Sequence, residues 1–382
     1  MEDVALQTTV AATRFRPGHA VQAPRLITRH WMHGPGLPGA AAVAIAGTRR
    51  LVGRRFSRRR ASIQGVPLLD LAQQPGQPTQ ATSPGPLLDA FRKIGAFQVR
   101  MPPKLAYDTR LIFSQFGDFM ALPEAARHQF LCDSKELLAV HGYQPRGGQG
   151  ERFNRFRSGV VFHGKNTLPL LPEPFEAEVA NWRDQVWRLS ERILDHLLHE
   201  LRCTGTLKEN LDPGAFHEGA SFDMISGSHF QLKQMHSAGQ DGESVRLPLH
   251  QDPSFMSLLI HASSKPPGQG LEILDDRAQE FVAVPRSGCE FATVLIGQLF
   301  HQLCGRGDMR FAKGSHRVVT RPEDMTKQRH TAVFFFQPQL DTLLRPLVPP
   351  TTGSHEAPIT FRERRLRSYQ RFARAAPPWQ KD

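Results

Sequence analysis

The amino-acid sequence predicts a β-sandwich, jelly roll or barrel with helices packed outside it. Two features of the 382-residue chain lead to this fold class. After residue 225, short apolar segments alternate with turn residues at regular intervals, which is typical of antiparallel β-structure. Before residue 225 the pattern is mostly helical and ends in one long amphipathic segment. No internal repeat is visible.

The composition is that of a globular protein, with 40% hydrophobic residues. No apolar run approaches the ~20 residues that a membrane helix needs, so we expect no membrane association. The four cysteines are scattered without a CxxC pair, which argues against a disulfide framework and against a cysteine zinc site. A reducing compartment fits this usage, and we expect a monomer in the cytoplasm.

The first 65 residues carry most of the positive charge. They hold eleven arginines, no lysine and two acids, which accounts for +9 of the net charge of +12. We expect residues 1–63 to be a basic, disordered extension. An organelle-targeting peptide is the first alternative, because such peptides are rich in arginine and poor in acids, and a misassigned start is another. A nucleic-acid arm is disfavoured because few aromatic residues could stack on bases, so we expect no nucleic-acid partner.

Residues 64–225 are expected to form a mostly helical region that precedes the β-core. It opens with a short strand at 65–71 and a loop to about residue 85. Residues 86–95 have helical spacing and end at Gly95, and a strand follows at 96–100. Two further helices are expected at 105–121 and 124–132, separated by Pro123. The stretch 133–174 is rich in Gly and Pro and is expected to be irregular, whereas 175–202 has the strongest helical periodicity in the chain.

Residues 226–345 are expected to form the β-core, and residues 346–382 a C-terminal segment with a covering helix near 360–373. Apolar segments bounded by turn residues mark the expected strands. They are "HFQLKQM", "LPLHQDPSFMSLLIHA", "GLEILDD", "EFVAVP", "CEFATVLIG", "HRVVT" and "TAVFFFQP".

One of these segments holds a histidine and an aspartate two residues apart, His250 and Asp252. In a strand, residues i and i+2 point to the same face, so both side chains would project into the interior. A buried carboxylate is costly unless it is paired. With one further histidine, the pair would form the facial triad of two histidines and one carboxylate that holds iron(II) and leaves positions open. The alternative is an exposed strand end with a solvated aspartate.

Two later segments supply the missing groups. "GSHRVVT" places His316 at the start of another apolar strand, sixty-four residues beyond Asp252. In "QRHTAVFFFQP", Arg329 and Thr331 again share one face of a strand. A guanidinium binds a carboxylate through two donors and a hydroxyl adds a third, so this pair could clamp a small acid. The alternative is a structural arginine at the strand edge, paired with an Asp or Glu.

In this order, HxD, HRV and RxT, the sequence resembles the iron(II)/2-oxoglutarate-dependent dioxygenases, and within them the isopenicillin N synthase-like branch. The resemblance spans about residues 64–375 and includes "VPLLDL", "HGYQPRG" and the stretch from "GLEILDD" to "GSHRVVT". It implies a mainly β fold with flanking helices, the double-stranded β-helix or distorted jelly roll. It implies that His250, Asp252 and His316 bind iron as the catalytic centre. It also implies that Arg329 and Thr331 hold the far carboxylate of 2-oxoglutarate.

The sequence departs from the family in the strand before the HxD pair. The family often has an Arg and a Tyr there, and the Tyr usually contacts the cosubstrate. This chain reads "FQLKQMHS" and has neither residue. Gln234, Met235 and His236 are the candidates for the Tyr position, and the sequence does not choose among them.

The resemblance implies an iron(II) enzyme that oxidises a small organic molecule with O2 and 2-oxoglutarate. Hydroxylation or desaturation would accompany release of succinate and CO2, in secondary metabolism. One alternative is an oxidase of the isopenicillin N synthase kind, which uses no keto acid and would turn Arg329 on the substrate. Another is a non-catalytic jelly-roll binding protein. In "ERFNRFRSG", Arg152, Arg155 and Arg157 could meet an acidic substrate, or could belong to a solvated loop.

Overall fold

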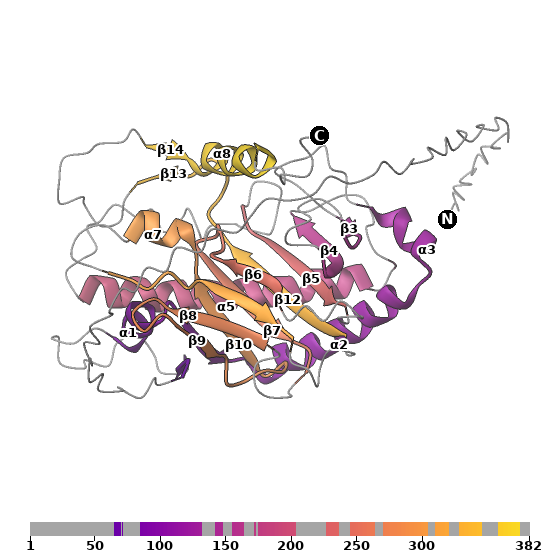
Figure 1. Cartoon of the computed structure of the whole chain (residues 1–382), viewed down its shortest axis with the longest axis horizontal. Coiled ribbons are helices and arrows are strands. Elements are labelled where there is room, and N and C mark those ends of the chain that lie inside the picture. Colours follow the sequence, from indigo (N-terminus) through magenta and orange to yellow (C-terminus); the bar gives the residue numbers. More distant parts are fainter. Residues whose placement is uncertain are drawn as a thin grey trace, which may run out of the picture. The chain divides into compact units, whose positions relative to one another are not determined.

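The computed structural model describes a large part of the unit Arg60–Asp382 (Figure 1). The expected extension at 1–63, most of the expected loop before residue 85 and Arg152 lie outside the described residues. The described residues are 65–69, 71, 85–131, 142–147, 155–163, 172, 175–203, 227–236, 245–263, 270–304, 310–320, 328–345 and 358–374.

The helices before the β-core form where the sequence periodicity predicts them. Prolines mark where two of them begin: α2 and α3 start directly after Pro102 and Pro123. The helix expected at 124–132 is shorter than predicted, because the chain passes from α3 into a 3-10 turn, η1. The elements are α1 (Pro86–Lys93), α2 (Pro103–Ala121), α3 (Glu124–Arg127), η1 (His128–Phe130) and α5 (Phe175–Cys203).

An eight-stranded sheet forms the centre of the described fold, with the order β1-β2-β10-β7-β12-β5-β4-β3. Helices α2 and α5 cover one face of it, and Trp182 of α5 donates a 2.8 Å hydrogen bond to Thr109 of α2. Its strands are β1 (Leu68–Leu69), β2 (Ala96–Arg100), β3 (Gly142–Gln144), β4 (Arg157–His163), β5 (His229–Met235), β7 (Met256–His261), β10 (Phe291–Ile296) and β12 (Arg329–Phe336).

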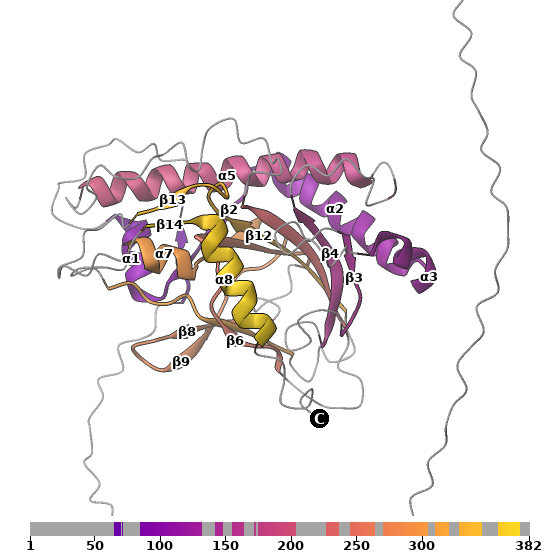
Figure 2. The same ribbon diagram turned by 90° about the horizontal axis from the view of Figure 1, so that it is seen from above.

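A four-stranded sheet with the order β6-β11-β8-β9 lies on the other side of the large sheet (Figure 2). Leu259 and Leu295 of the large sheet pack there against Leu271, Ile273 and Val282 of the small one. The strands are β6 (Val245–His250), β8 (Leu271–Asp275), β9 (Glu280–Ala283) and β11 (His316–Val319). Two facing sheets with helices outside confirm the predicted fold class.

Two strands occupy the stretch that the sequence predicts to be irregular, so that prediction is wrong for the described part of 133–174. Strand β4 pairs with β5 along its whole length, and β3 pairs with β4. Glycine within the stretch suggested a loop, but at Gly159 it permits close pairing. A Cβ atom there would lie 2.0 Å from the Leu232 carbonyl oxygen, so only glycine fits.

The expected single strand at 247–262 is two strands, because β6 ends at His250 and β7 begins at Met256. Pro253 lies between them, and the backbone carbonyls of Asp252 and Ser254 accept hydrogen bonds from the first turn of α7 (Gln298–Cys304). This helix was not predicted. Its seven residues are too few to show a helical period.

The C-terminal helix is confirmed as α8 (Phe361–Arg374), which follows a short hairpin of β13 (Leu343–Leu344) and β14 (Ile359–Thr360). Among the described residues, no helix combines the length and apolar character that a membrane crossing requires.

Candidate metal centre and carboxylate pocket

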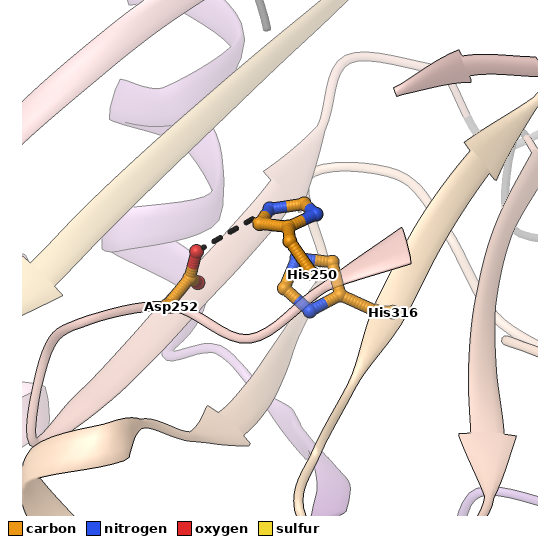
Figure 3. A group of neighbouring side chains, drawn as sticks. All are labelled: His250, Asp252 and His316. Carbon is orange, nitrogen blue, oxygen red and sulfur yellow. Dashed lines mark ion pairs between the residues drawn. The ribbon is translucent and has the colours of Figure 1, made fainter. Parts of the chain in front are cut away.

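His250, Asp252 and His316 converge between the two sheets (Figure 3). His250 ends β6 and His316 begins β11, and the two residues are directly opposite each other in the antiparallel pair. Their ring centroids are 4.2 Å apart, and His250 Nε2 lies 3.5 Å from Asp252 Oδ1. One ligand atom from each residue lies within 4.8 Å of the others, which is close enough for the three to share one cation.

Both imidazoles are oriented by backbone carbonyls. His250 Nδ1 lies 2.8 Å from the Pro248 oxygen, and His316 Nδ1 lies 3.2 Å from the Gly314 oxygen. A carbonyl oxygen only accepts, so each Nδ1 must carry the proton. This tautomer leaves the Nε2 lone pair of each ring available to a metal, as in metal sites whose histidines are held from outside.

Asp252 is only 5% exposed, and its Oδ2 has no hydrogen-bond partner in the described structure. Burial would raise the pKa of this carboxyl. At the low pH where this carboxyl titrates, His316 is protonated. Its charge, together with hydrogen bonds from His250 and Ser257, outweighs burial and holds the pKa of Asp252 below its usual range. A buried carboxylate oxygen without a donor is costly, and a bound cation would satisfy it. These residues therefore fit a divalent metal ion.

His316 is ready to bind a metal at neutral pH. Burial lowers the pKa of its imidazole to about 4, although the charge of Asp252 acts in the opposite direction. The imidazole is therefore neutral and the carboxylate ionised at pH 7. These are the protonation states that metal ligands require.

Asp252 reaches this position from a turn, so the strand-face argument from the sequence is wrong for it. The turn is held from two sides. Gln298 donates its backbone N–H to the Asp252 carbonyl at 2.8 Å. From α8, Arg364 donates to the Pro253 carbonyl at 3.1 Å and to Gln302 Oε1 at 2.7 Å. Arg364 thus links the turn of Asp252 to helix α7.

Replacing Arg364 with Met should weaken metal binding while the protein stays folded. The variant keeps the apolar stem but frees the turn that positions Asp252, and losing an outer partner of a metal ligand costs roughly tenfold or more in affinity. Titration of the protein with zinc, which is redox-inert, measures this change. The matched control is Arg362→Met on the same helix, because Arg362 pairs with Asp341 on the surface at 2.9 Å. Equal zinc affinities in both variants would contradict the positioning role.

Arg329 and Thr331 lie on the same face of β12, as the sequence predicts, and this face is turned toward the small sheet. Val333, two residues further on, packs on the cluster between the two sheets. His330 points to the opposite face and contacts Phe116 of α2, with ring centroids 5.1 Å apart. The side chains of Arg329 and Thr331 thus border the space that the triad also borders.

His261 is a third member of this group of side chains, and it was not predicted from the sequence. It pairs with Thr331 across β7 and β12, and its Nδ1 lies 3.2 Å from Thr331 Oγ1. Its Nε2 is buried and has no partner in the described structure. Burial and the charge of Arg329 lower the pKa of His261 to about 3, so the imidazole is neutral. The sequence did contain one signal for His261: it lies two residues after Leu259 in an apolar strand, so the two side chains share a face.

The register also shows which of Gln234, Met235 and His236 lies beside Arg329. Met235 of β5 is directly opposite Arg329, so their side chains share a face. Gln234 points to the other face and hydrogen bonds His330, and His236 hydrogen bonds Ser158. An apolar thioether therefore occupies the position beside Arg329.

Arg157 belongs to this face too. It begins β4 directly opposite Met235, so it points toward the small sheet and not into a solvated loop. Lys233 of β5, two residues before Met235, is directly opposite Thr331 and shares the same face. Its Nζ donates to Gln144 Oε1 at 2.5 Å. The inner face of the large sheet thus carries three cationic residues on three adjacent strands.

No protein-family model matches the chain, and no curated protein matches it in sequence. Its fold does match solved structures. One is a full-length Neurospora crassa protein in complex with alpha-KG and thymine, at 15% identity and a TM-score of 0.62, covering 81% of this chain and 97% of that one. Another is JOX2 in complex with 2OG, Fe and JA, at 20% identity and a TM-score of 0.59, covering 79% and 84%.

A third match is the rice dioxygenase for auxin oxidation, at 20% identity and a TM-score of 0.51, covering 80% of this chain and 95% of that one. The chain therefore has the jelly-roll fold of the 2OG-Fe(II) oxygenases over most of its length. The matches do not single out the isopenicillin N synthase-like branch.

Proposed function

We propose that this protein is an iron(II)- and 2-oxoglutarate-dependent oxygenase of a small organic molecule. One observation carries the proposal: two imidazoles and a carboxylate with a buried, partnerless oxygen converge between the sheets of this fold. The fold neighbours in complex with alpha-KG or with 2OG and Fe support it. The buried triad argues against a merely structural jelly-roll binding protein, because an aspartate in that position stabilises little without a cation.

His250, Asp252 and His316 would hold the iron. Bound iron(II) supplies activation of O2, coupled to decarboxylation of 2-oxoglutarate to succinate and CO2. The residues of the chain would orient the metal ligands and supply the negative charge that balances the metal. The Pro248 and Gly314 carbonyls would keep both Nε2 atoms oriented toward the metal.

Arg329 and Thr331 would bind the far carboxylate of 2-oxoglutarate, with His261 completing the set of donors. Thr331 has one proton and shares its oxygen with His261 Nδ1. If Thr331 donates to Nδ1, then Nε2 of His261 carries a proton for the carboxylate. If Nδ1 donates to Thr331, the hydroxyl proton is available instead. Either tautomer gives the pair one donor for an anion, beside the guanidinium of Arg329.

Release of labelled CO2 from 1-[14C]-2-oxoglutarate tests the proposal. The iron-loaded protein should release CO2 slowly without substrate and faster when a substrate is added, with one succinate formed for each CO2. Removal of iron by a chelator should stop both. If the protein consumes O2 with a substrate but leaves 2-oxoglutarate intact, it is an oxidase without a keto acid. Arg329 then acts on the substrate itself.

A further inference from the structure

His261 ends strand β7 beside the proposed carboxylate site on β12, and the two strands are neighbours in the large sheet (Figure 1). It is directly opposite Thr331, and its Nδ1 lies 3.2 Å from Thr331 Oγ1. Arg329 precedes Thr331 by two residues on the same face, so it is the diagonal neighbour of His261 across the strand pair. Strand register therefore places the imidazole next to both residues of the clamp.

The second ring nitrogen of His261 is buried without a partner. Leu259, on the same face of β7, packs against the small sheet, so the His261 ring also points toward that sheet. Nε2 is the far nitrogen of the ring and lies deeper between the sheets than Nδ1. His261 is only 5% exposed, and Nε2 has no hydrogen-bond partner in the described structure. A buried polar atom of this kind indicates a group that the described residues do not supply.

An anion is the group that fits Nε2. Burial and the charge of Arg329 lower the pKa of His261 to about 3, so the ring is neutral at pH 7 and has one proton on one of its nitrogens. A cation is disfavoured beside a guanidinium, and the metal-binding cluster among the described residues is the triad, which does not include His261. A carboxylate that pairs with Arg329 would accept a hydrogen bond from Nε2 if the ring proton is there.

The hydroxyl of Thr331 decides where the ring proton lies. If Thr331 donates to Nδ1, the ring proton is on Nε2 and is directed at the carboxylate, so the hydroxyl and both ring nitrogens are paired. If Nδ1 donates to Thr331, the hydroxyl turns to the carboxylate, and Nε2 keeps a buried lone pair that faces an anion. The first arrangement leaves no polar atom of the pair unsatisfied, so it is the more stable one when a carboxylate is bound.

We propose that His261, and not Thr331, is the second direct contact of the carboxylate that Arg329 holds, and that this contact is made by the N–H of Nε2. Thr331 is then a positioning residue, which holds the imidazole with Nδ1 as an acceptor. The inference rests on the proposed function for the identity of the carboxylate, the far one of 2-oxoglutarate. The resemblance to the dioxygenase family implies a direct contact of Thr331 instead.

NMR of the histidine ring nitrogens tests the position of the proton. Zinc-loaded protein with isotope-labelled histidine and saturating 2-oxoglutarate should show His261 as a neutral ring protonated on Nε2. His330 is an internal reference, because its Nε2 lies 3.1 Å from Gln234 Oε1 and must already have the proton that this amide oxygen accepts. The His330 signals should not change when 2-oxoglutarate is added. A His261 proton on Nδ1 in the complex overturns the inference.

Calorimetry of 2-oxoglutarate with the zinc-loaded protein separates the two residues. His261→Phe should weaken binding roughly ten- to 150-fold, since a charge-assisted hydrogen bond contributes about 1.5–3 kcal/mol. Thr331→Val should weaken it only about twofold, because without the hydroxyl about half of the rings still have their proton on Nε2. The matched control is Thr293→Val, which removes a buried hydroxyl that accepts from Gln98 at 3.1 Å, and it should change nothing. A larger loss in Thr331→Val than in His261→Phe overturns the inference.

Two amide variants show which ring nitrogen makes the contact. The amide nitrogen of glutamine reaches about as far from the backbone as Nε2, and that of asparagine about as far as Nδ1. His261→Gln should therefore recover part of the affinity that His261→Phe loses, whereas His261→Asn should not. Recovery in His261→Asn alone contradicts a contact through Nε2.

The outcome is separable from that of the proposed function. If 2-oxoglutarate binds with the proton on Nε2 of His261 but the iron-loaded protein never decarboxylates it, the contact stands and the oxygenase is rejected. If decarboxylation is normal and His261→Phe binds 2-oxoglutarate like the wild type, the oxygenase stands and the contact is rejected. Absence of any 2-oxoglutarate binding rejects both.

Discussion

Replacing Asp252 with Ala should abolish iron binding and all turnover of 2-oxoglutarate. The carboxylate is the only negative group in the triad, and two imidazoles alone cannot balance the charge of a divalent cation in a buried site. The loss in metal affinity should exceed the roughly 100-fold that the loss of an outer-shell partner can cause. His316→Ala should act in the same direction, because His316 supplies an Nε2 ligand atom from the opposite strand.

Metal content after dialysis against iron(II) and calorimetric zinc titration measure this effect. The matched control is Glu272→Gln, since Glu272 is a carboxylate of the same small sheet that pairs with Arg317 at 2.8 Å. That variant should keep wild-type metal affinity. A His316→Ala protein that holds iron and turns over like the wild type would show that the triad assignment is wrong.

Replacing Arg329 with Ala should weaken the binding of 2-oxoglutarate roughly ten- to 150-fold, because a charge-assisted hydrogen bond contributes about 1.5–3 kcal/mol. Arg329→Lys restores the charge but not the fork of donors, so it should recover only part of the affinity. Arg329 also lowers the pKa of His261, and its removal should raise the pKa of that imidazole. His261 then becomes easier to protonate as the pH falls.

Calorimetry of 2-oxoglutarate with the zinc-loaded protein measures the affinity, and NMR titration of the His261 ring measures its pKa. The control is Arg317→Gln, which removes an arginine of the small sheet whose guanidinium stacks over Phe281 and pairs with Glu272. If 2-oxoglutarate binds equally well to Arg329→Ala, its carboxylate lies elsewhere and the clamp must be abandoned.

Local sequence patterns predicted most of the helices and strands, because the residues of each such element show its apolar periodicity or its turn residues without reference to distant partners. The three- and four-residue apolar steps of 175–202 exist whether or not the helix is packed, and α5 follows them. The turn at Gly95 was visible for a similar reason. Its φ of +72° favours glycine, and its backbone lies against Gly314, two residues before His316.

Elements without a local signal were missed. Strand β4 looks like a loop until β5, whose residues lie 66 to 78 positions further along the chain, pairs with it. Helix α7 is one short segment whose first backbone N–H groups bind the turn of Asp252. Neither feature can be recognised from the few residues that form it, because the energy that stabilises each comes from partners distant in the chain.

By itself, the sequence determined the chemistry of the candidate site: which residues can ligate a metal, in what order they occur, and that Arg329 and Thr331 share a strand face. Tertiary structure alone decided that Asp252 enters from a turn, that His261 joins Thr331, and that Arg157 faces inward. The physical reason is register. Which side chains face one another across a sheet depends on the pairing of strands that lie tens of residues apart, and a shift of one residue would turn each of them to the opposite face.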